Sequence, residues 1–484
     1  MKRFIALAMT VLMLAALITV PTFAEELEFV APDENWTAAE DGVFYIADAA
    51  DLLAFSVSAQ INSYYVGQTV KLTEDIDMTG IEWFPVAKFM GTLDGDGHAI
   101  KGISVTGQTG TMGFITSADS ATFQNIRFLD FATTIATSGG GTAGLVVGST
   151  AGSGTITFKN VYVSGTSTTA SHRAGGFVGH TNGASNLVFE NCVGNVTCIG
   201  KRAGVFLSHL NPGAGVVTIT NCVAMGDLTQ AGDQTGAFVG VTGGHLTMER
   251  CISLVNLEGA SKEAGAFFLL DHQGADSVKT LNPIINVTDC YAAVDAEHYA
   301  FAMFTGRGWP FKLTVKYDGQ TVYEKNSTEE STLNDDRDVI EAATKYYATP
   351  NTVNVTKDNF ATKMTAFTGW VDAGMTATYM TGKTADVFVP ASVKTLMDAP
   401  FTPKVDEPTD TEPTETEPTE TEPTVTEPQA TEPQATQPQA TKTQATDTQT
   451  TGETGCASAI GVSALAVFAL AGGAMMIARK RRED

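Results

Sequence analysis

Between residues 121 and 290, the chain repeats a short pattern of apolar and polar positions. Apolar residues stand four and two positions before a recurring polar anchor, and the residues between them are mostly polar. This alternation predicts a strand with one buried face. The next apolar residue follows the anchor directly, so a bend is expected there, because Asn and Asp tolerate the backbone conformations of such corners. The anchors are Asn125, Asn160, Asn191, Asn221, Arg250 and Asp289.

The anchors lie 29 to 39 residues apart. A second signature, glycine followed by apolar residues, precedes most of them, as in "AGLVVG", "GGFVGH" and "TGAFVG". Units of this length that bury one face and stack are typical of solenoids. The pattern therefore predicts an all-β fold, a parallel β-helix solenoid with coils of about 30 residues, stacked about 4.8 Å apart. A β-propeller is the alternative, although its blades usually carry aromatic signatures.

The same pattern sets the expected limits of the folded part. Residues 25–88 are expected to form an N-terminal cap with one short helix, which Asp48 caps and in which Leu52 and Phe55 share a face. The β-helix repeats are expected over 89–305. The repeat breaks after that, and 306–400 are expected to form an α+β C-terminal cap or a small domain.

Both ends of the chain carry apolar runs. Residues 1–24 combine two basic residues, an apolar run and small residues, which predicts a secretory signal peptide. Residues 401–455 are rich in Thr, Pro and Glu and predict a disordered, extended stalk. Residues 456–484 hold an apolar run and a basic tail, which predicts a transmembrane helix with a cytoplasmic end. No L-P-x-T-G precedes that run, so a retained membrane anchor is the simpler expectation.

Composition narrows the classes of partner. The formal net charge is −25, and nucleic-acid binding needs a basic face, so no nucleic-acid partner is expected. Charged residues make up only 17% of the chain. Low charge with many small and β-branched residues favours strands and tight turns over helices.

The repeats resemble those of the GLUG-repeat surface proteins of bacteria. The resemblance rests on "GLVVG", "GGFVG" and "GAFVG", and on the lead-in "LTEDIDMTGIEWFPVAKFMGTLDGDGHAIKGISV", and it covers residues 43–304. It implies a β-helical protein on the cell surface of a Gram-positive-type bacterium. Such repeats also occur beside zinc-protease domains in IgA-cleaving peptidases. That protease needs an H-E-x-x-H helix, and no histidine of this chain is followed by Glu, so the activity is not expected here.

Four cysteines follow the anchors in one column. Ile126 and Val161 occupy the same column on other coils, so a buried ladder of thiols is expected. Disulfides between neighbouring coils are the alternative, since stacked coils lie close enough. Zinc is disfavoured, because its ligands usually stand two to four residues apart. The column contains Cys192, Cys222, Cys251 and Cys290.

Two further groups have both a structural and a functional interpretation. The anchor residues Asn160, Asn191 and Asn221 are expected to bond to one another from coil to coil, or else to present an exposed ladder to a glycan. Four aspartates in the lead-in have carboxylate oxygens of the kind that bind calcium. Turns between strands explain the same stretch equally well. It contains Asp75, Asp77, Asp94 and Asp96, and no other cofactor is expected.

One edge of the repeats is basic. Four basic residues on adjacent coils are expected to bind an acidic sugar, or else to form a solvated turn edge. They are His172 and Arg173 on one coil and Lys201 and Arg202 on the next. No column repeats an acidic residue on neighbouring coils, which favours binding over catalysis. The sequence thus predicts a membrane-anchored adhesin that binds an extracellular glycan or protein. A polysaccharide lyase or hydrolase on a β-helix and a structural envelope protein are the alternatives.

Overall fold

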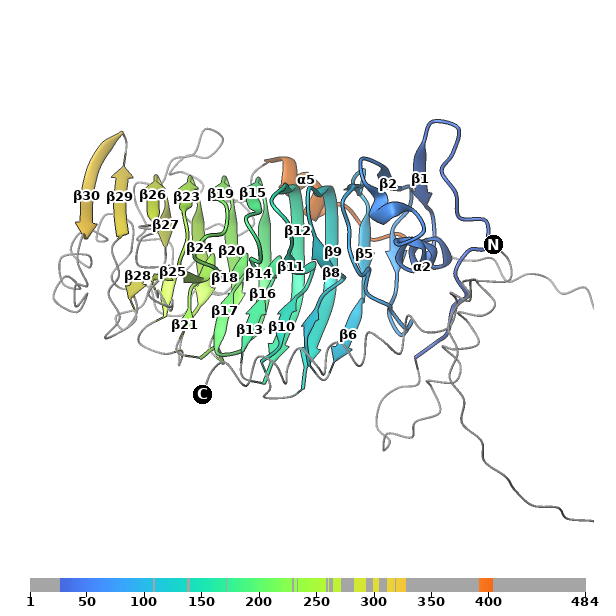
Figure 1. The fold of residues 1–484 in the computed structure, drawn as a ribbon, viewed down its shortest axis with the longest axis horizontal. Coiled ribbons are helices and arrows are strands. Elements are labelled where there is room, and N and C mark those ends of the chain that lie inside the picture. The colour runs from blue at the N-terminus through green and yellow to red at the C-terminus, as the bar shows by residue number, and fades with distance from the viewer. Residues whose placement is uncertain are drawn as a thin grey trace, which may run out of the picture. The chain divides into compact units, whose positions relative to one another are not determined.

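The fold was analysed in a computed structural model of the chain. It describes residues 27–107, 109–136, 140–170, 172–228, 230–232, 234–257, 260, 264–270, 283–292, 299–303, 311–317, 319–327 and 391–403. Over these residues the chain is a solenoid of parallel strands with few helices, which confirms the predicted all-β parallel class (Figure 1). The predicted signal peptide, most of the stalk and the transmembrane helix lie outside these residues. Within them, no helix has the length and apolar character of a membrane span.

The first face of the solenoid is a stack of parallel strands in register. Phe123 pairs with Phe158, and Phe158 with Phe189, so the inward side chains form a column through the coils. Alternation of inward apolar and outward polar residues is what makes these segments strands with one buried side. The strands are β1 (Val43–Ile46), β2 (Thr69–Leu72), β4 (Thr92–Asp94), β9 (Thr122–Ile135), β12 (Thr155–Thr169), β15 (Asn186–Glu190), β19 (Val217–Thr220), β23 (Leu246–Glu249), β26 (Ile284–Thr288) and β29 (Phe311–Tyr317).

The second face follows the anchor residues. Asn160 and Asn191 adopt positive φ angles of 52° and 54°, as do the other anchors, which confirms the predicted bend. Long strands β9 and β12 pass through this corner and contribute to both faces. The other strands of the second face are β3 (Ile76–Asp77), β5 (Ala99–Lys101), β6 (Ser104–Gly107), β16 (Val193–Ile199), β20 (Val223–Asp227), β24 (Ile252–Asn256) and β27 (Tyr291–Ala292).

Two smaller sheets of short parallel strands complete the coils from residue 111 onward. The glycine signature lies at the corner between them. At Gly175 an added Cβ would lie 2.1 Å from the carbonyl oxygen of Val178, so only glycine fits this close approach. The first small sheet holds β7 (Thr111–Met112), β10 (Thr142–Gly144), β13 (Arg173–Gly175), β17 (Arg202–Gly204) and β21 (Gln234–Thr235). The second holds β8 (Ile115–Ala118), β11 (Val147–Thr150), β14 (Val178–His180), β18 (Leu207–Leu210), β22 (Val239–Thr242), β25 (Gly265–Leu270) and β28 (Tyr299–Met303).

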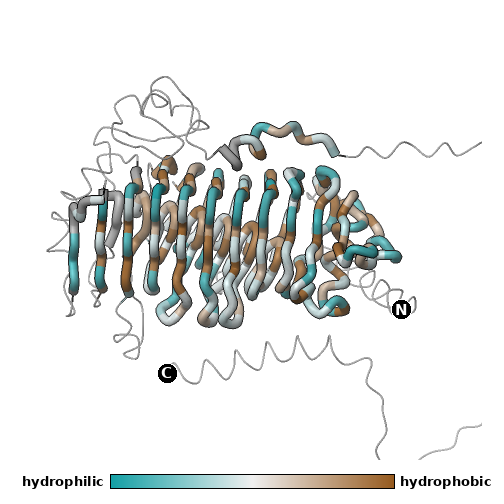
Figure 2. The backbone as a smooth tube through the Cα atoms, turned by 90° about the horizontal axis from the view of Figure 1, so that it is seen from above, coloured by the Kyte–Doolittle hydropathy of each residue, from teal (hydrophilic) through white to brown (hydrophobic). Residues whose placement is uncertain are grey.

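The core runs along the inside of the coils. Phe158 stacks between Phe123 and Phe189, with ring centroids 4.9 and 5.0 Å away. A second column stacks Phe177 on Phe206 at 4.6 Å, and the two columns meet edge to face. Figure 2 shows the resulting alternation of apolar and polar positions along the stacked coils. Aromatic stacking in register thus ties each coil to the next.

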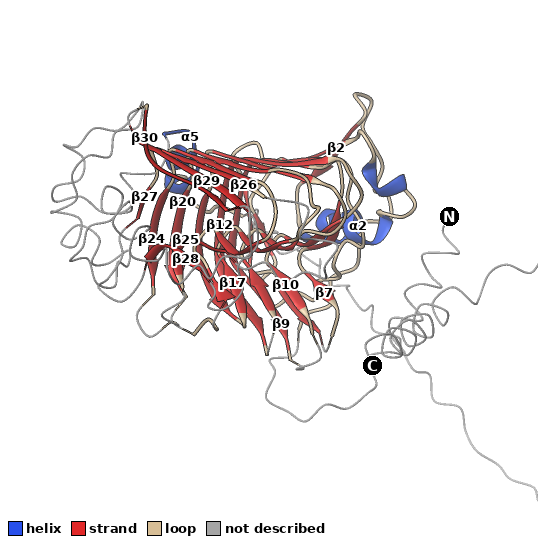
Figure 3. Ribbon diagram, turned by 60° about the vertical axis from the view of Figure 1, so that its left-hand side comes forward, coloured by secondary structure: helices blue, strands red, loops and turns tan. Residues whose placement is uncertain are grey.

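Helices lie at the margins of the solenoid (Figure 3). Helix α2 (Ala49–Ser58) begins after Asp48, whose side chain accepts a hydrogen bond from the backbone of Asp51, and it buries Leu52 and Phe55. The 3-10 helix η1 (Ser63–Tyr65) follows it. Strand β30 (Gln320–Ser327) pairs antiparallel with β29, and α5 (Ala391–Asp398) lies much later in the chain.

Parallel stacking extends beyond the expected limits of 89–305. Strand β1 pairs with β2 inside the segment expected to be an N-terminal cap, and β29 pairs with β26 beyond residue 305. The strands of these early coils are two to four residues long. Of the expected C-terminal cap, the structure describes β29, β30 and α5.

Candidate functional site

Five basic side chains gather on two adjacent coils, and we call them the basic cluster. Strands β13 and β17 place Arg173 directly beside Arg202, and His172 precedes Arg173. Strands β14 and β18 place His180 directly beside His209. The tight glycine corner in each coil joins these strand pairs, so the arginine column and the histidine column meet. The sequence predicted three of these residues and missed His180 and His209.

Hydrogen bonds connect the basic cluster across the two coils. Arg173 donates through Nε to Nδ1 of His209 at 3.0 Å, and its Nη1 lies 3.2 Å from Nδ1 of His172. The Nη1 of Arg202 lies 3.4 Å from Nε2 of His172. The rings of His180 and His209 stack with centroids 5.2 Å apart. The cluster is therefore a connected set in which imidazole rings hold both guanidinium groups.

Burial and charge set the cluster apart from ordinary surface residues. Arg202 and His209 are only 8% and 7% exposed, and the other three are partly buried. Arg202 also donates through Nε to Gln234 on the following coil, at 2.6 Å. Among the described residues, no carboxylate lies within ion-pair distance of Arg173. A partly buried guanidinium without a carboxylate is costly unless another anion compensates it.

The surroundings keep the imidazoles neutral. Burial, followed by the charges of Arg173 and Arg202, lowers the pKa of His172 to about 4. Burial and the charge of Arg173 lower the pKa of His180 to about 3 and that of His209 well below its ordinary value. Burial and the charge of Arg202 lower the pKa of Arg173 to about 10. At neutral pH the imidazoles are therefore uncharged and Arg173 remains charged, so Nδ1 of His209 accepts the hydrogen bond from Arg173 Nε. Neutral His172 has a single acceptor nitrogen for a guanidinium, and its Nδ1 also lies 3.2 Å from the carbonyl oxygen of Gly141.

One polar atom in the cluster has no partner. His180 Nε2 is buried and makes no hydrogen bond to any described residue. Lys201 is exposed beside the cluster, and its charge contributes to the lowered pKa of His172. His180 and His209 each follow the glycine of the repeat signature by the same interval, and this recurrence is the sequence signal that indicates the pair. Chemically, the guanidinium of Arg173 and the unpartnered imidazole nitrogen of His180 suit an anion with several oxygens.

The anchor asparagines form a ladder that runs from coil to coil. Asn160 donates to Oδ1 of Asn125 at 3.0 Å, and Asn191 donates to Oδ1 of Asn160 at 3.2 Å. Asn221 continues the ladder to Asn191 at 3.2 Å, and Nε of Arg250 donates to Oδ1 of Asn221 at 2.7 Å. These amides are engaged with one another, which leaves little of them for a ligand.

The cysteine column lies inside the coils. All four cysteines are free thiols and at most 1% exposed. The backbone N–H of Cys192 donates to Sγ of Cys222 at 3.4 Å, and the thiol of Cys251 donates to the carbonyl of Ile219 at 3.3 Å. Burial raises the pKa of Cys222 and of Cys290 well above the ordinary value. Cys222 and Cys290 are thus packed as uncharged thiols, and all four side chains of the column are buried in the core.

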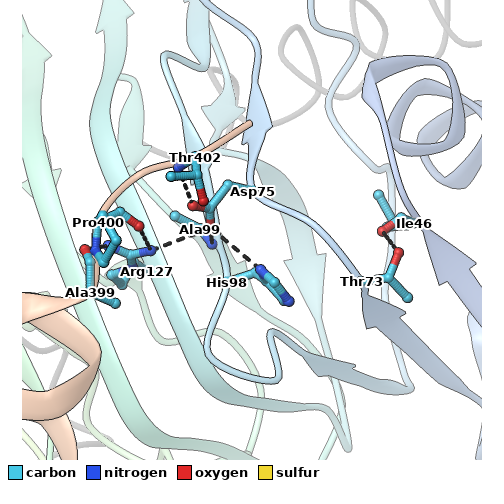
Figure 4. A network of polar contacts seen from close by, with 9 residues as sticks. All are labelled: Ile46, Thr73, Asp75, His98, Ala99, Arg127, Ala399, Pro400 and Thr402. Carbon is cyan, nitrogen blue, oxygen red and sulfur yellow. Dashed lines mark hydrogen bonds and ion pairs between the residues drawn. The ribbon is translucent and has the colours of Figure 1, made fainter. Parts of the chain in front are cut away.

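The four aspartates considered for calcium have other partners. Asp77 accepts a hydrogen bond from the backbone of Thr79 at 2.9 Å. Asp94 accepts from the backbone of Asp96 at 3.0 Å, and Asp96 forms an ion pair with Lys71 at 2.9 Å. Asp75 is buried and contacts residues far away in sequence, as Figure 4 shows. Over the described part of the chain, no three His, Cys, Asp or Glu side chains converge to hold a metal ion.

The comparisons with known proteins give two partial similarities and no family. No protein-family model matches it. It is similar to halomucin of Haloquadratum walsbyi (strain DSM 16790 / HBSQ001), at 32% identity over 174 residues, which is 32% of this chain and 2% of halomucin. The chain therefore spans a very small part of that relative. Among solved structures it resembles a Bacteroides ovatus protein crystallised as a candidate immunoglobulin A1 protease. That match covers 68% of this chain and 89% of the other at 12% identity, with a TM-score of 0.30, and no activity follows from it.

Proposed function

We propose that the chain is a bacterial cell-surface β-solenoid of the GLUG-repeat type that binds an acidic extracellular glycan. The observation that carries this proposal is Arg173, a partly buried cation whose described neighbours are histidines and a second arginine. A carboxylate or sulfate of a sugar would supply the missing negative charge. Guanidinium groups bind such anions with two parallel hydrogen bonds, which favours an anionic ligand over a neutral one.

The rigid scaffold supports binding rather than a conformational cycle. Four of the five cluster side chains, all except His172, stand on short strands that are held in register by neighbouring coils. Strand-borne side chains of this kind are preorganised, so little entropy is lost when a ligand binds. Acid–base catalysis on a glycan needs positioned carboxylates, and the described neighbours of Arg173 include none.

Display outside the cell rests on the sequence and on one comparison. The proposed signal peptide would export the chain, and the proposed helix within 456–484 would hold it in the membrane. The stalk would then raise the solenoid above the surface. The match over 174 residues to a protein named as a mucin supports an extracellular setting.

Binding of the full-length chain to an array of uronate-containing and sulfated glycans, with their neutral counterparts, tests the proposal. We expect acidic glycans to bind and their neutral counterparts to fail. Arg173→Met should weaken binding at least tenfold, because truncating one partner of a buried charge contact costs about 2–5 kcal/mol. Lys159→Met is the matched control, since Lys159 is exposed and pairs with Glu190 on another face. Equal binding of neutral glycans, or full binding by Arg173→Met, contradicts the proposal.

A further inference from the structure

Residues 391–403 lie against coils that are far away in the sequence, and we call this segment the strap. Its helix α5 packs on β9 and β12, and Leu396 is only 7% exposed there. Beyond the helix the chain is extended, and Pro403 forms an isolated parallel bridge with Asp75 of the first coils. The last three residues of the strap, 401–403, are the first residues of the expected Thr/Pro/Glu-rich stalk.

Two solenoid side chains hold the strap through its backbone. Asp75 accepts a hydrogen bond through Oδ2 from the backbone N–H of Thr402 at 2.7 Å. Arg127 donates through Nη1 to the carbonyl of Ala399 at 2.6 Å and through Nη2 to that of Pro400 at 3.3 Å. Figure 4 shows both side chains between the coils and the strap. These three hydrogen bonds are all made to backbone atoms of the strap.

The buried pair takes several of its hydrogen bonds from the strap. Asp75 and Arg127 are each 3% exposed and lie 3.3 Å apart. A buried ion pair repays its desolvation only when further hydrogen bonds use its remaining donors and acceptors. Asp75 has such bonds from Ala99 as well as from Thr402, and the two carbonyls of the strap serve Arg127. Without the strap, both charged groups would lose partners while the coils still cover much of their surface.

A second contact fixes the extended part of the strap. The ammonium of Lys101 lies 5.2 Å from the ring centroid of Phe401, within the range of a cation–π interaction. The strap is thus held at three successive places, by α5 on the coils, by the Asp75–Arg127 pair and by Lys101. Its contacts connect residues 272 to 327 positions apart.

We propose that the strap is a clasp that fastens the stalk to the first coils, independently of the chain between β30 and α5. A pull on the stalk would then enter the solenoid at Asp75 and Arg127. The last coils would then carry no load. Without the clasp the pull would act on the last coil, and the solenoid would open coil by coil, because each coil contacts only its neighbours. This inference concerns attachment alone and does not depend on the proposed glycan ligand.

Cutting the chain between the strap and the coils tests the clasp. A protease recognition sequence is inserted between residues 328 and 390 of the full-length chain, which is cleaved and then passed through a size-exclusion column under native conditions. We expect the C-terminal fragment to stay with the solenoid. Its immediate separation overturns the proposal. A retained complex of twice the expected mass also overturns it, because the strap would then lie on a second copy.

A matched pair of variants identifies the attachment. Thr402→Pro removes the backbone donor to Asp75 and leaves every solenoid side chain in place, so the cleaved fragment should be released. Thr402→Ala keeps that donor and changes only an exposed side chain, so its fragment should be retained. Circular dichroism checks that both variants keep the strands. Equal retention by Thr402→Pro and Thr402→Ala overturns the assignment of the clasp to the Asp75 contact.

Discussion

The side-chain amide of Asn191 donates a hydrogen bond to Oδ1 of Asn160, 3.2 Å away on the preceding coil. Both residues adopt positive φ angles at the corner between the first and second faces. One residue type thus makes the turn within a coil and the bond between coils. Stacked amides of this kind need partners on both sides, so the ladder favours a single register of the coils.

Replacing Asn191 should separate its two roles. Asn191→Ala loses the side-chain hydrogen bonds to Asn160 and Asn221. It also places alanine at a positive φ angle, which strains the backbone. The free energy of unfolding should therefore fall by about 2–4 kcal/mol. Asn191→Gly loses the same bonds but tolerates the backbone, so the loss should be about 1–2 kcal/mol. Urea unfolding measures both values. Equal losses would show that the backbone conformation contributes nothing.

The buried thiols should resist alkylation in the native protein. Burial raises the pKa of Cys222 and of Cys290, so little thiolate forms near neutral pH and the reagent has no access. Iodoacetamide labelling followed by mass spectrometry should modify these residues only after denaturation. Cys222→Ser should cost about 1–3 kcal/mol, because it buries a hydroxyl in an apolar column. Rapid native labelling would contradict the packing of this column.

The phenylalanine column should carry a large part of the stability. Phe158→Ala removes a ring that stacks on Phe123 and on Phe189, so it should lower the unfolding free energy by about 3–5 kcal/mol. Phe158→Leu keeps most of the volume and should cost clearly less. Thermal unfolding monitored by circular dichroism ranks the two variants. A smaller loss for Ala than for Leu would contradict stacking as the link between coils.

The basic cluster should make stability depend on pH. The folded-state pKa of His172 is about 4, below the ordinary 6.5, so the unfolded chain binds the proton first as pH falls. The stability that neutral His172 contributes is complete above pH 6.5 and is lost as pH falls through 4. His172→Gln should therefore show a shallower loss of unfolding free energy between pH 7 and pH 4. Urea titrations of both proteins measure this, and parallel curves would contradict the lowered pKa.

The interior of each coil could be predicted because its signals are local. Leu187 and Phe189 alternate with polar residues, Asn191 turns the chain, and Cys192 points inward again, as the structure shows. Each of these features depends on residues within one short stretch, so the sequence alone is enough to predict the strand, the bend and the inward side chains. Parallel stacking is also present on both sides of the expected limits of 89–305, in β1 with β2 and in β26 with β29.

By itself, therefore, the sequence determined the parallel solenoid, its corners and its buried columns, since burial of one strand face and the bend at Asn are set by neighbouring residues. Only the tertiary structure decided that His180 and His209 join Arg173, because side chains of different coils meet only once the register of stacking is fixed. It alone decided that Thr402 contacts Asp75, 327 positions away. A contact made by backbone atoms leaves no pattern of residue types along the chain, and only folding brings its two ends together.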